Sequence, residues 1–543
     1  MRRALLLGLL LGLGCGPEEP PVVADDDDDL VAGDDDDSGD DDDSAPQPWR
    51  SALYPQDWQP GLTVDGARLH DFSYAGYRQS SEPLPDVSSW PIEDVTLLGA
   101  DPTGATDSTA AIQTALDTVA AGTRVHLPAG TYRVDGLLRL ETSGVVVTGD
   151  GPESTFLRFT RSDDMTNRGH LTLSGNASLG ADRPLLADGA VFATTVTLED
   201  AAGLAPGDHV QLGHVITDDY VADHGMESFW NVSNGQWRAF ARRQVVAVDG
   251  DEVTLDVPLR TDLLVRDGAS LRVVTGLLSE VGVQDLSLST EVDWSAAWSD
   301  DRTHGILLND VRDAWVRNVA SYSGTGEGEY HLMSGGVKVL DSKQVTVQGV
   351  TFERAQNRGG GGNGYLFEVS RSTEVLFADC VGRAGRHNFI QNWDFGTSGV
   401  VWLRTTSEEG YARLDSSSGL GSVGASEFHH SLATANLIDD SVVHDAWKAV
   451  NRRTFSSGAG HTAADVVFWN LRGTGTLTSF QYGVGAIVGT GEDLSVVTDL
   501  SMGGLFAEAS GTEPEDRVEG AGEAATLEPP SLFEDQLARR LGR

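Results

Sequence analysis

Short apolar segments with one spacing recur along the central part of the chain. Each has the form apolar-x-apolar-x-x-apolar, and they begin at Ala314, Val345, Val375, Val400 and Val466. The first residues of the first four segments are 31, 30 and 25 residues apart. The last two segments begin 66 residues apart, which leaves room for another strand at 437–443. Repeated strands without helical patterns between them predict a coiled solenoid and argue against an alternating βαβ sheet.

The start of this region adds a helical pattern. Residues 94–100 and 124–127 have strand-like patterns, and Asp107 precedes a segment with apolar side chains at helical spacing. The sequences G-A-D-P-T-G-A-T-D-S-T-A-A-I-Q-T-A-L, V-H-L-P-A-G-T-Y and V-V-V-T-G-D-G, in this order, resemble the opening of the pectate-lyase superfamily. The resemblance implies an all-β, right-handed parallel β-helix (a solenoid) with an N-terminal capping helix. It does not fix the chemistry, because this superfamily includes lyases, hydrolases and phage tail proteins.

An insertion interrupts the repeats of the β-helix, which we expect to span residues 94–505. Residues 188–270 contain four β-like runs and a polar, aromatic loop at 216–226, which predicts a small antiparallel β insertion. Long loops on rigid scaffolds often form binding sites. A surface flap with no role in chemistry is the alternative for this insertion.

The first 15 residues have the pattern of an export signal. Two arginines precede an apolar core of 11 residues, which is too short to span a bilayer and ends at Cys15. The segment Leu11–Cys15 resembles the lipobox of bacterial lipoproteins, although Gly12 stands where leucine is usual. The resemblance implies a lipid on Cys15 and an exported protein at the outer membrane or cell surface. Ordinary signal-peptide cleavage nearby is the alternative.

Weakly hydrophobic, acidic segments flank the predicted folded region. Residues 16–50 contain aspartate runs of 5, 4 and 4 and predict a disordered tether. Calcium binding by these runs is the alternative, although they lack the glycine and terminal glutamate of an EF-hand loop. Residues 51–93 form an N-terminal extension. Residues 506–543 form an acidic C-terminal tail, which we expect to be loose, with a helical pattern at 532–541.

The charge balance narrows the choice of partners. The chain has 82 acidic and 38 basic side chains, a net charge of −44. This argues against nucleic-acid binding and against attachment to anionic lipid through basic residues, so a lipid anchor would be the only membrane contact. Basic residues nevertheless gather between Arg383 and Arg453, which suits an acidic extracellular polysaccharide. The alternative is that they only neutralise nearby acids.

Residues at the same offset in successive coils of a solenoid stack in columns. Three places beyond successive cores lie Glu353, Arg383 and Glu408. The candidate site residues on this flank and in the adjoining coils are Arg383, Arg386, His387, Asn388, Trp393, Arg413, Asp415, His429, His430, Lys448, Asn451 and Arg452.

Three segments of this region resemble a group of secreted bacterial β-helix proteins described as pectate-lyase-like. They are R-H-N-F from Arg386, the histidine pair from His429, and G-A-G-H from Gly458. Two of them depart from the group: Ser431 and the next leucine replace an arginine–tryptophan pair, and a histidine–glycine–tryptophan run is lost after His461. The departures imply changed specificity or lost activity.

Cleavage of a uronate polymer by β-elimination needs a base for the C5 proton and a cation for the carboxylate. His387 or His430 is the candidate base, because histidine titrates near neutral pH. The candidate cations are Arg386, Lys448 and Arg452. The residues predicted to bind substrate are Arg383, Asn388, Trp393, Arg413, Asp415, His429 and Asn451. The leading hypothesis is a surface-anchored polysaccharide lyase.

Two other functions fit the same fold. A glycoside hydrolase needs two carboxylates about 5 Å or about 6.5–9.5 Å apart, and the candidates are Glu408, Asp415, Asp439 and Asp440. A non-catalytic, glycan-binding β-helix is the second alternative. The sequence assigns no metal ligands, and calcium that bridges an acidic sugar to the acidic protein is the candidate cofactor.

Overall fold

A computed structural model describes residues 47–417, 419–498 and 515–543. The export signal, Cys15 and nearly all of the predicted tether lie outside these residues. In the described part of the chain, no helix is long and apolar enough to cross a membrane.

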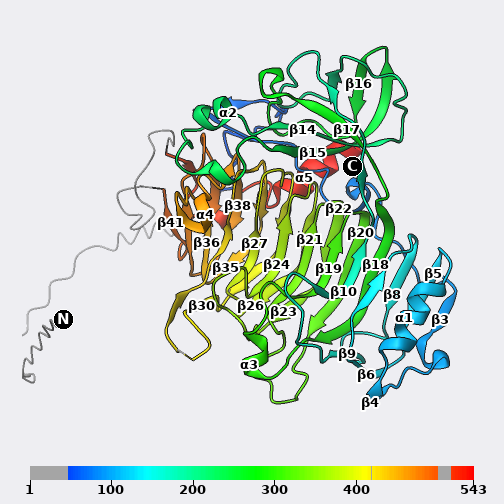
Figure 1. Ribbon diagram of the computed structural model, residues 1–543. Coiled ribbons are helices and arrows are strands. Elements are labelled where there is room, and N and C mark those ends of the chain that lie inside the picture. Colours follow the sequence, from blue (N-terminus) through cyan, green and yellow to red (C-terminus); the bar gives the residue numbers. More distant parts are fainter. Residues whose placement is uncertain (1–46, 418, 499–514) are drawn as a thin grey trace, which may run out of the picture. The chain divides into compact units, whose positions relative to one another are not determined.

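Three parallel sheets form a β-helix (Figure 1). The first sheet has ten strands, in the order β7 (Leu138–Leu140), β10 (Gly169–Ser174), β19 (His304–Asn309), β21 (Gly335–Leu340), β24 (Tyr365–Ser370), β27 (His387–Gln391), β32 (Ser426–Phe428), β36 (Ala446–Ala449), β39 (Thr476–Ser479) and β41 (Ser495–Val497).

The other two sheets share the long strands β18 (Leu278–Ser289) and β20 (Val311–Ser321). The second continues through β3 (Ile92–Asp94), β5 (Thr123–His126), β8 (Val145–Thr148), β22 (Lys343–Gln348), β25 (Leu376–Ala378), β28 (Val401–Leu403), β34 (Leu437–Asp439), β38 (Val467–Leu471), β40 (Ala486–Thr490) and β42 (Arg517–Glu519). The third continues through β4 (Thr103–Asp107), β6 (Gly130–Val134), β9 (Thr155–Phe159), β23 (Thr351–Glu353), β26 (Val381–Arg383), β29 (Thr406–Glu408) and β35 (Val442–Val443). These pairings confirm the predicted parallel β-helix.

The repeated apolar residues stack in register inside the coils. Val347 pairs with Phe377, Phe377 with Trp402, and Trp402 with Ile438. All four side chains are buried. Ile438 therefore fills the coil whose register the sequence left open, and the predicted repeat holds across the irregular step.

The N-terminal end carries the expected capping helix, α1 (Thr109–Thr118). Ile112, Ala115 and Leu116 are buried in the same core as the coils. The helix begins after Ser108, and Asp107 accepts a hydrogen bond from the Thr109 amide at 2.9 Å. The predicted N-cap is thus one residue early, although its carboxylate still satisfies a free amide of the first turn.

An antiparallel sheet is inserted between β10 and β18. It consists of β11 (Ser178–Leu179), β12 (Arg183–Pro184), β13 (Thr195–Thr197), β14 (His209–Val215), β15 (Trp237–Asp249), β16 (Glu252–Leu255) and β17 (Ser270–Thr275), and α2 (Asp218–Asp223) lies in the loop after β14. The four predicted β runs correspond to β13 to β16. The sheet extends beyond the expected bounds at both ends, because the short strands β11 and β12 pair with β17.

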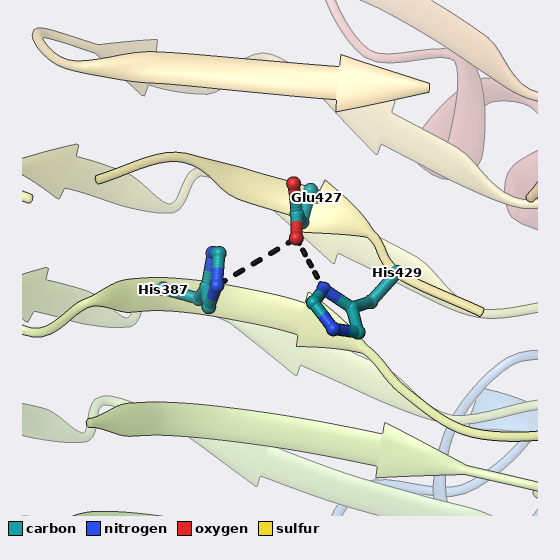
Figure 2. Close-up of side chains that lie close together, drawn as sticks. All are labelled: His387, Glu427 and His429. Carbon is teal, nitrogen blue, oxygen red and sulfur yellow. Dashed lines mark hydrogen bonds and ion pairs between the residues drawn. The ribbon is translucent and has the colours of Figure 1, made fainter. Parts of the chain in front are cut away.

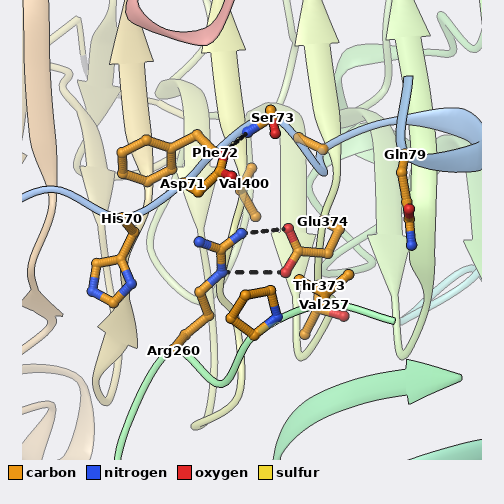
Figure 3. Close-up of polar contacts among 12 residues, drawn as sticks. His70, Asp71, Phe72, Ser73, Gln79, Val257, Arg260, Thr373, Glu374 and Val400 are labelled. Atoms are coloured by element: carbon orange, nitrogen blue, oxygen red, sulfur yellow. Dashed lines mark hydrogen bonds and ion pairs between the residues drawn. The ribbon is translucent and has the colours of Figure 1, made fainter. Parts of the chain in front are cut away.

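A buried ion pair joins this insertion to the β-helix (Figure 3). Arg260, from the loop after β16, donates to Glu374 with Nη2–Oε2 and Nε–Oε1 distances of 3.0 and 3.4 Å. Nη1 of Arg243 lies 3.5 Å from the same carboxylate. The three side chains are at most 2% exposed, so the charges are almost completely removed from water.

The two ends of the folded region lie together on the second sheet. Residues 49–82, here called the strap, place Leu53, Tyr54 and Phe72 in one buried cluster with Val401 and side chains of neighbouring strands. Helix α5 (Leu532–Leu541) joins the same cluster.

The C-terminal end is held by a buried carboxylate. Asp439 accepts hydrogen bonds from Ser531 Oγ at 2.7 Å and from the Phe533 amide at 2.8 Å, at the start of α5. Leu532 and Phe533 are buried. The expectation of a loose tail is therefore wrong for residues 515–543, because the apolar side of α5 is covered by the β-helix.

Candidate functional site

A cleft of about 540 Å³ lies on the outer face of the first sheet. Leu307 pairs with Lys338 and Lys338 with Glu368, so these residues form a column across β19, β21 and β24. The neighbouring residues Val337 and Val339 are buried in the core, which places Lys338 on the outside. The side chains used below that line the cleft are Arg302, Lys338, Tyr365, Arg371, Arg386, Trp393, His429, Ser456 and Ser457.

Four of the lining side chains are cationic. Lys338 Nζ lies 2.9 Å from Glu368, and Arg371 makes two hydrogen bonds to Asp341, of 3.0 and 2.7 Å. Arg302 and Arg386 have no ion-pair partner among the described residues, and Arg386 donates instead to the Gly359 carbonyl at 2.8 Å. Within the described part of the chain, the cleft thus holds two guanidinium groups whose charge no acid neutralises, in a protein of net charge −44.

His429 is held by the carboxylate of Glu427 (Figure 2). A carboxylate only accepts hydrogen bonds, so Nδ1 of His429 carries the proton of this contact. Burial lowers the pKa of His429, which keeps the ring neutral near pH 7. The lone pair therefore lies on Nε2, which is 3.1 Å from Ser456 Oγ at the cleft wall.

Two further groups surround Glu427. His387 donates from Nδ1 to the Ala425 carbonyl, and its Nε2 lies 3.6 Å from Glu427 Oε1. Arg452 Nη1 lies 3.5 Å from the same oxygen and donates to the His429 carbonyl at 2.8 Å. These cationic and polar neighbours hold the pKa of Glu427 well below its usual value, against its burial. Glu427 is therefore an ionised group that orients His429.

Tyr365 lies beside this group. Its ring centroid is 5.1 Å from that of His387 and 6.1 Å from that of His429, and the Arg386 guanidinium lies 6.0 Å from its ring centroid. Burial raises the pKa of Tyr365 to about 12. The phenol therefore stays protonated at neutral pH and can donate a proton into the cleft.

Trp393 provides an apolar surface in the cleft. It is 41% exposed and its ring packs on His430 with a centroid distance of 4.0 Å. Its φ of 44° is unusual for a non-glycine residue. An exposed, supported indole in a polar cleft is suited to stacking on a sugar ring.

His387, Glu427 and His429 are also the one set in the described part of the chain that could ligate a common metal ion, since their donor atoms lie within 4.8 Å of one another. Two imidazoles and one carboxylate suit zinc or another transition metal, whereas calcium prefers oxygen ligands. The Arg452 guanidinium beside Glu427 would repel a cation at this position. We therefore interpret the cluster as a hydrogen-bonded acid–base group.

The structure brings together part of the predicted site. Arg386, Trp393 and His429 line the cleft, and His387 and Arg452 lie behind it. The other predicted residues do not line it.

His430 donates from Nε2 to the Ser456 carbonyl at 3.0 Å, and its other nitrogen bonds to Ser431. Unlike His429, it does not line the cleft, so it is not placed to take a proton from a sugar bound there. Lys448, on β36, pairs in register with Glu427 on the neighbouring strand β32. Asn451 is buried and accepts a hydrogen bond from the Arg453 amide. None of these three residues lines the cleft.

Two other predicted residues are held by neighbouring acids outside the cleft lining. Arg383 bonds to Glu408 from Nε at 2.7 Å and to Glu353 from Nη1 at 2.7 Å, so the predicted column exists but its charge is neutralised. Asn388 is buried and donates to Asp445 at 2.8 Å. Neither Arg383 nor Asn388 lines the cleft, and their role as substrate ligands stays a prediction.

The remaining candidates also lie outside the cleft. Arg413, on the hairpin of β30 (Tyr411–Arg413) and β31 (Gly421–Val423), lies over the Trp294 ring at 5.2 Å, and Asp415 caps Ser417 in the same hairpin. Asp439 holds α5, and Asp440 pairs with Arg472. None of these residues lines the cleft.

Sequence reasoning missed Lys338, Tyr365, Glu427 and Ser456. The column Glu353, Arg383 and Glu408 runs along the third sheet, whereas the cleft lies on the first. In the first sheet, Tyr365 on β24 pairs in register with His387 on β27. Glu427 also stands two residues before His429, the spacing of neighbours on one face of a strand, which could have indicated the pair.

A family model described as rhamnogalacturonase A/epimerase, pectate lyase-like, matches residues 92–196. No curated protein matches the chain. Among solved structures, the tailspike gp61 of Pseudomonas phage phi297 is 13% identical, with a TM-score of 0.38, and the match covers 74% of this chain and 75% of that one.

Two other solved structures are similar. One is the gp54 tailspike of Acinetobacter baumannii bacteriophage AP22 in complex with capsular saccharide, at 9% identity and a TM-score of 0.32, covering 75% of this chain and 65% of that one. The other is the A-module of the Azotobacter vinelandii mannuronan C-5 epimerase AlgE6, at 12% identity and a TM-score of 0.26, covering 79% and 98%. The strand pairing confirms the parallel β-helix, and its N-terminal part is similar to the pectate-lyase-like family model over residues 92–196.

Proposed function

We propose that this cleft cleaves a uronate-containing, acidic polysaccharide by β-elimination. The observation that carries the proposal is the orientation of His429: Glu427 holds one ring nitrogen, and the other presents its lone pair at the wall of a cationic cleft. A neutral, oriented imidazole is suited to taking the C5 proton of a uronate. The match of residues 92–196 to the rhamnogalacturonase A/epimerase, pectate lyase-like model supports the broader assignment to a carbohydrate-active protein.

The cations and the phenol supply the rest of the reaction. Arg302 and Arg386 can pair with uronate carboxylates, which lowers the cost of forming negative charge when the C5 proton leaves. Tyr365 remains protonated and can donate its proton to the glycosidic oxygen as that bond breaks. One product chain has a new reducing end, and the other has an unsaturated sugar at its new non-reducing end.

Glycoside hydrolysis is less well supported, because it needs a carboxylic acid that is protonated at working pH. The acidic residues nearest the cleft column are Glu368 and Glu427. Lys338 and the neighbouring His304 lower the pKa of Glu368 to about 2, and that of Glu427 is also low. Both are therefore fixed as carboxylates and neither can act as the acid.

We also propose, from the leader sequence, that the protein is exported and anchored through a lipid on Cys15. The mature chain would then act at the outer membrane or cell surface. Labelling of cells with a radioactive fatty acid would test this, with Cys15→Ser as the control that should not be labelled.

The function is tested with polymers of galacturonic, mannuronic, guluronic and glucuronic acid, measuring the ultraviolet absorbance of the unsaturated product and the reducing ends released. We expect both signals to rise together on at least one polymer. His429→Ala and Tyr365→Phe should each slow elimination by about 10²–10⁴-fold. Arg413→Ala is the matched control and should leave the rate unchanged, because Arg413 lies on the hairpin outside the cleft.

Two outcomes would refute the lyase assignment. Reducing ends without absorbance would show a hydrolase. Retained glycan binding with neither signal, unaffected by His429→Ala, would show a binding protein without catalysis.

A further inference from the structure

Ser456 completes a chain of hydrogen bonds at the edge of the cleft. Its Oγ lies 3.1 Å from His429 Nε2, and His429 Nδ1 bonds to Glu427. Ser456 is half-buried and lines the cleft. Because the lone pair of His429 is on Nε2, the hydroxyl donates to it, and the order Ser–His–Glu is that of an activated nucleophile, its base and the group that orients the base.

The backbone at Ser456 is strained and held from two sides. Ser456 and Ser457 have φ angles of 52° and 64°, in the left-handed region that non-glycine residues rarely adopt. Such strain costs about 1–3 kcal/mol for each residue and persists only where the surroundings impose it. The β-helix imposes it through His430, which donates to the Ser456 carbonyl at 3.0 Å.

The insertion holds the other side of this loop. Trp230 donates from Nε1 to the Ala459 carbonyl at 2.9 Å. A Cβ on Gly458, whose φ is +87°, would lie 2.0 Å from the Phe229 carbonyl oxygen, so the two segments are in close contact. The loop around Trp230 therefore fixes the position of Ser456, which gives the insertion a role at the site.

We propose that Ser456, His429 and Glu427 hydrolyse an acyl ester on a sugar hydroxyl of the glycan in the cleft. The inference goes beyond β-elimination and does not require it. An ester is the substrate class indicated, because a serine nucleophile with a histidine base performs acyl transfer. The acyl group would be carried by the sugar, since Ser456 and the exposed Trp393 line the same cleft.

The reaction balances with water as the only co-substrate. His429 Nε2 takes the Ser456 proton as Oγ attacks the ester carbonyl carbon. The bond from that carbon to the sugar oxygen breaks, and the sugar oxygen takes the proton from Nε2, which leaves an acyl-Ser456. A water then attacks this acyl group, His429 takes the proton of the water and returns it to Ser456 Oγ, and the carboxylic acid leaves.

The charged groups suit these steps. Glu427 stays ionised and accepts from Nδ1 throughout, which stabilises the imidazolium formed in each half-reaction. Arg386 lines the same cleft without an acidic partner among the described residues and provides positive charge for the oxyanion.

The test uses the purified chain with 4-nitrophenyl acetate and with an O-acetylated uronate polymer, measuring nitrophenol and acetate. Ser456→Ala should reduce both by at least about 10²-fold and keep β-elimination of the deacetylated polymer. Ser417→Ala is the matched control: this serine lies in the hairpin outside the cleft, bonded to Asp415, and its replacement should keep ester hydrolysis. Tyr365→Phe should do the reverse of Ser456→Ala, losing elimination and keeping ester hydrolysis.

A fluorophosphonate probe gives an independent readout. It should label the wild-type chain at Ser456, identified by peptide mass spectrometry, and should not label Ser456→Ala. Wild-type ester hydrolysis by Ser456→Ala, or absence of the label from Ser456 in the folded wild-type chain, would overturn the proposal. Neither result would affect β-elimination, so failure of one activity can be distinguished from failure of the other.

Discussion

Replacing Glu374 by glutamine should strongly destabilise the protein. The change removes the only acid that neutralises Arg260 and Arg243 among the described residues, at a position where all three side chains are at most 2% exposed. Arg243 keeps hydrogen bonds to the carbonyls of Val257 and Pro258 at 2.9 and 2.8 Å. The side-chain hydrogen bonds of Arg260 in the described part of the chain all go to Glu374, so Arg260 becomes the uncompensated charge.

The expected loss is about 3–5 kcal/mol, the range for breaking a buried ion pair by removing one partner. For about 480 folded residues, an unfolding entropy of roughly 2.1 cal/mol/K per residue amounts to about 1 kcal/mol/K. The melting temperature should therefore fall by about 3–5 °C if unfolding is cooperative. Urea denaturation followed by tryptophan fluorescence measures the free-energy change directly.

The double variant Arg260→Met/Glu374→Gln distinguishes an orphaned charge from general damage. It removes the charge as well as its partner, so it should recover most of the lost stability. Asp379→Asn, at the exposed pair with Arg404, is the control and should cost less than about 1 kcal/mol. A single variant as stable as the control, or a double variant no better than the single one, would contradict this reasoning.

Four further predictions concern the cleft. Trp393→Ala should raise KM for the polymer by about 10-fold with little change in stability, because an exposed stacking surface is lost; Trp393→Phe should retain most of the affinity. Arg386→Ala should weaken elimination more at low than at high salt, and Arg386→Lys should rescue part of it, as measured by kcat/KM across ionic strengths. The rate of elimination should fall only below pH 6.5, because the neutral form of His429 is the base and its pKa is lowered. The rate should stay constant into the alkaline range, because the pKa of Tyr365 is about 12. A loss of rate that begins at or above pH 7 on the acid side would exclude His429 as the base. Gly458→Ala should reduce ester hydrolysis more than elimination, measured side by side, because a Cβ there meets the Phe229 carbonyl and displaces the serine loop.

The repeating coil could be predicted from the sequence because its signal is local. Apolar residues at fixed offsets, such as Val347 and Phe377, must stack in any coil of this length, and they do. The same logic correctly placed Glu353, Arg383 and Glu408 in one column. It could not show that this column is internally neutralised, because ion pairing depends on side-chain geometry within the column.

The cleft was only partly predictable because it combines segments from distant coils and the insertion. Arg386 and His429 were found as an excess of basic residues in an acidic chain. Ser456 was missed because an isolated serine in a loop carries no signal until its neighbours in space are known. Asp439 shows the converse: it was a reasonable hydrolase candidate by composition, yet its carboxylate is occupied by the start of α5.

The strap has a consequence for how the chain folds. Solenoids with contacts only between adjacent coils can unfold from an end, one repeat at a time. Here the Tyr54 ring packs against Trp469 of β38, and Tyr77 donates to Glu280 of β18 at 2.6 Å, so one segment touches early and late coils of the described chain. The strap can dock only after those coils exist, which raises the contact order and favours slow, all-or-none closure over gradual fraying.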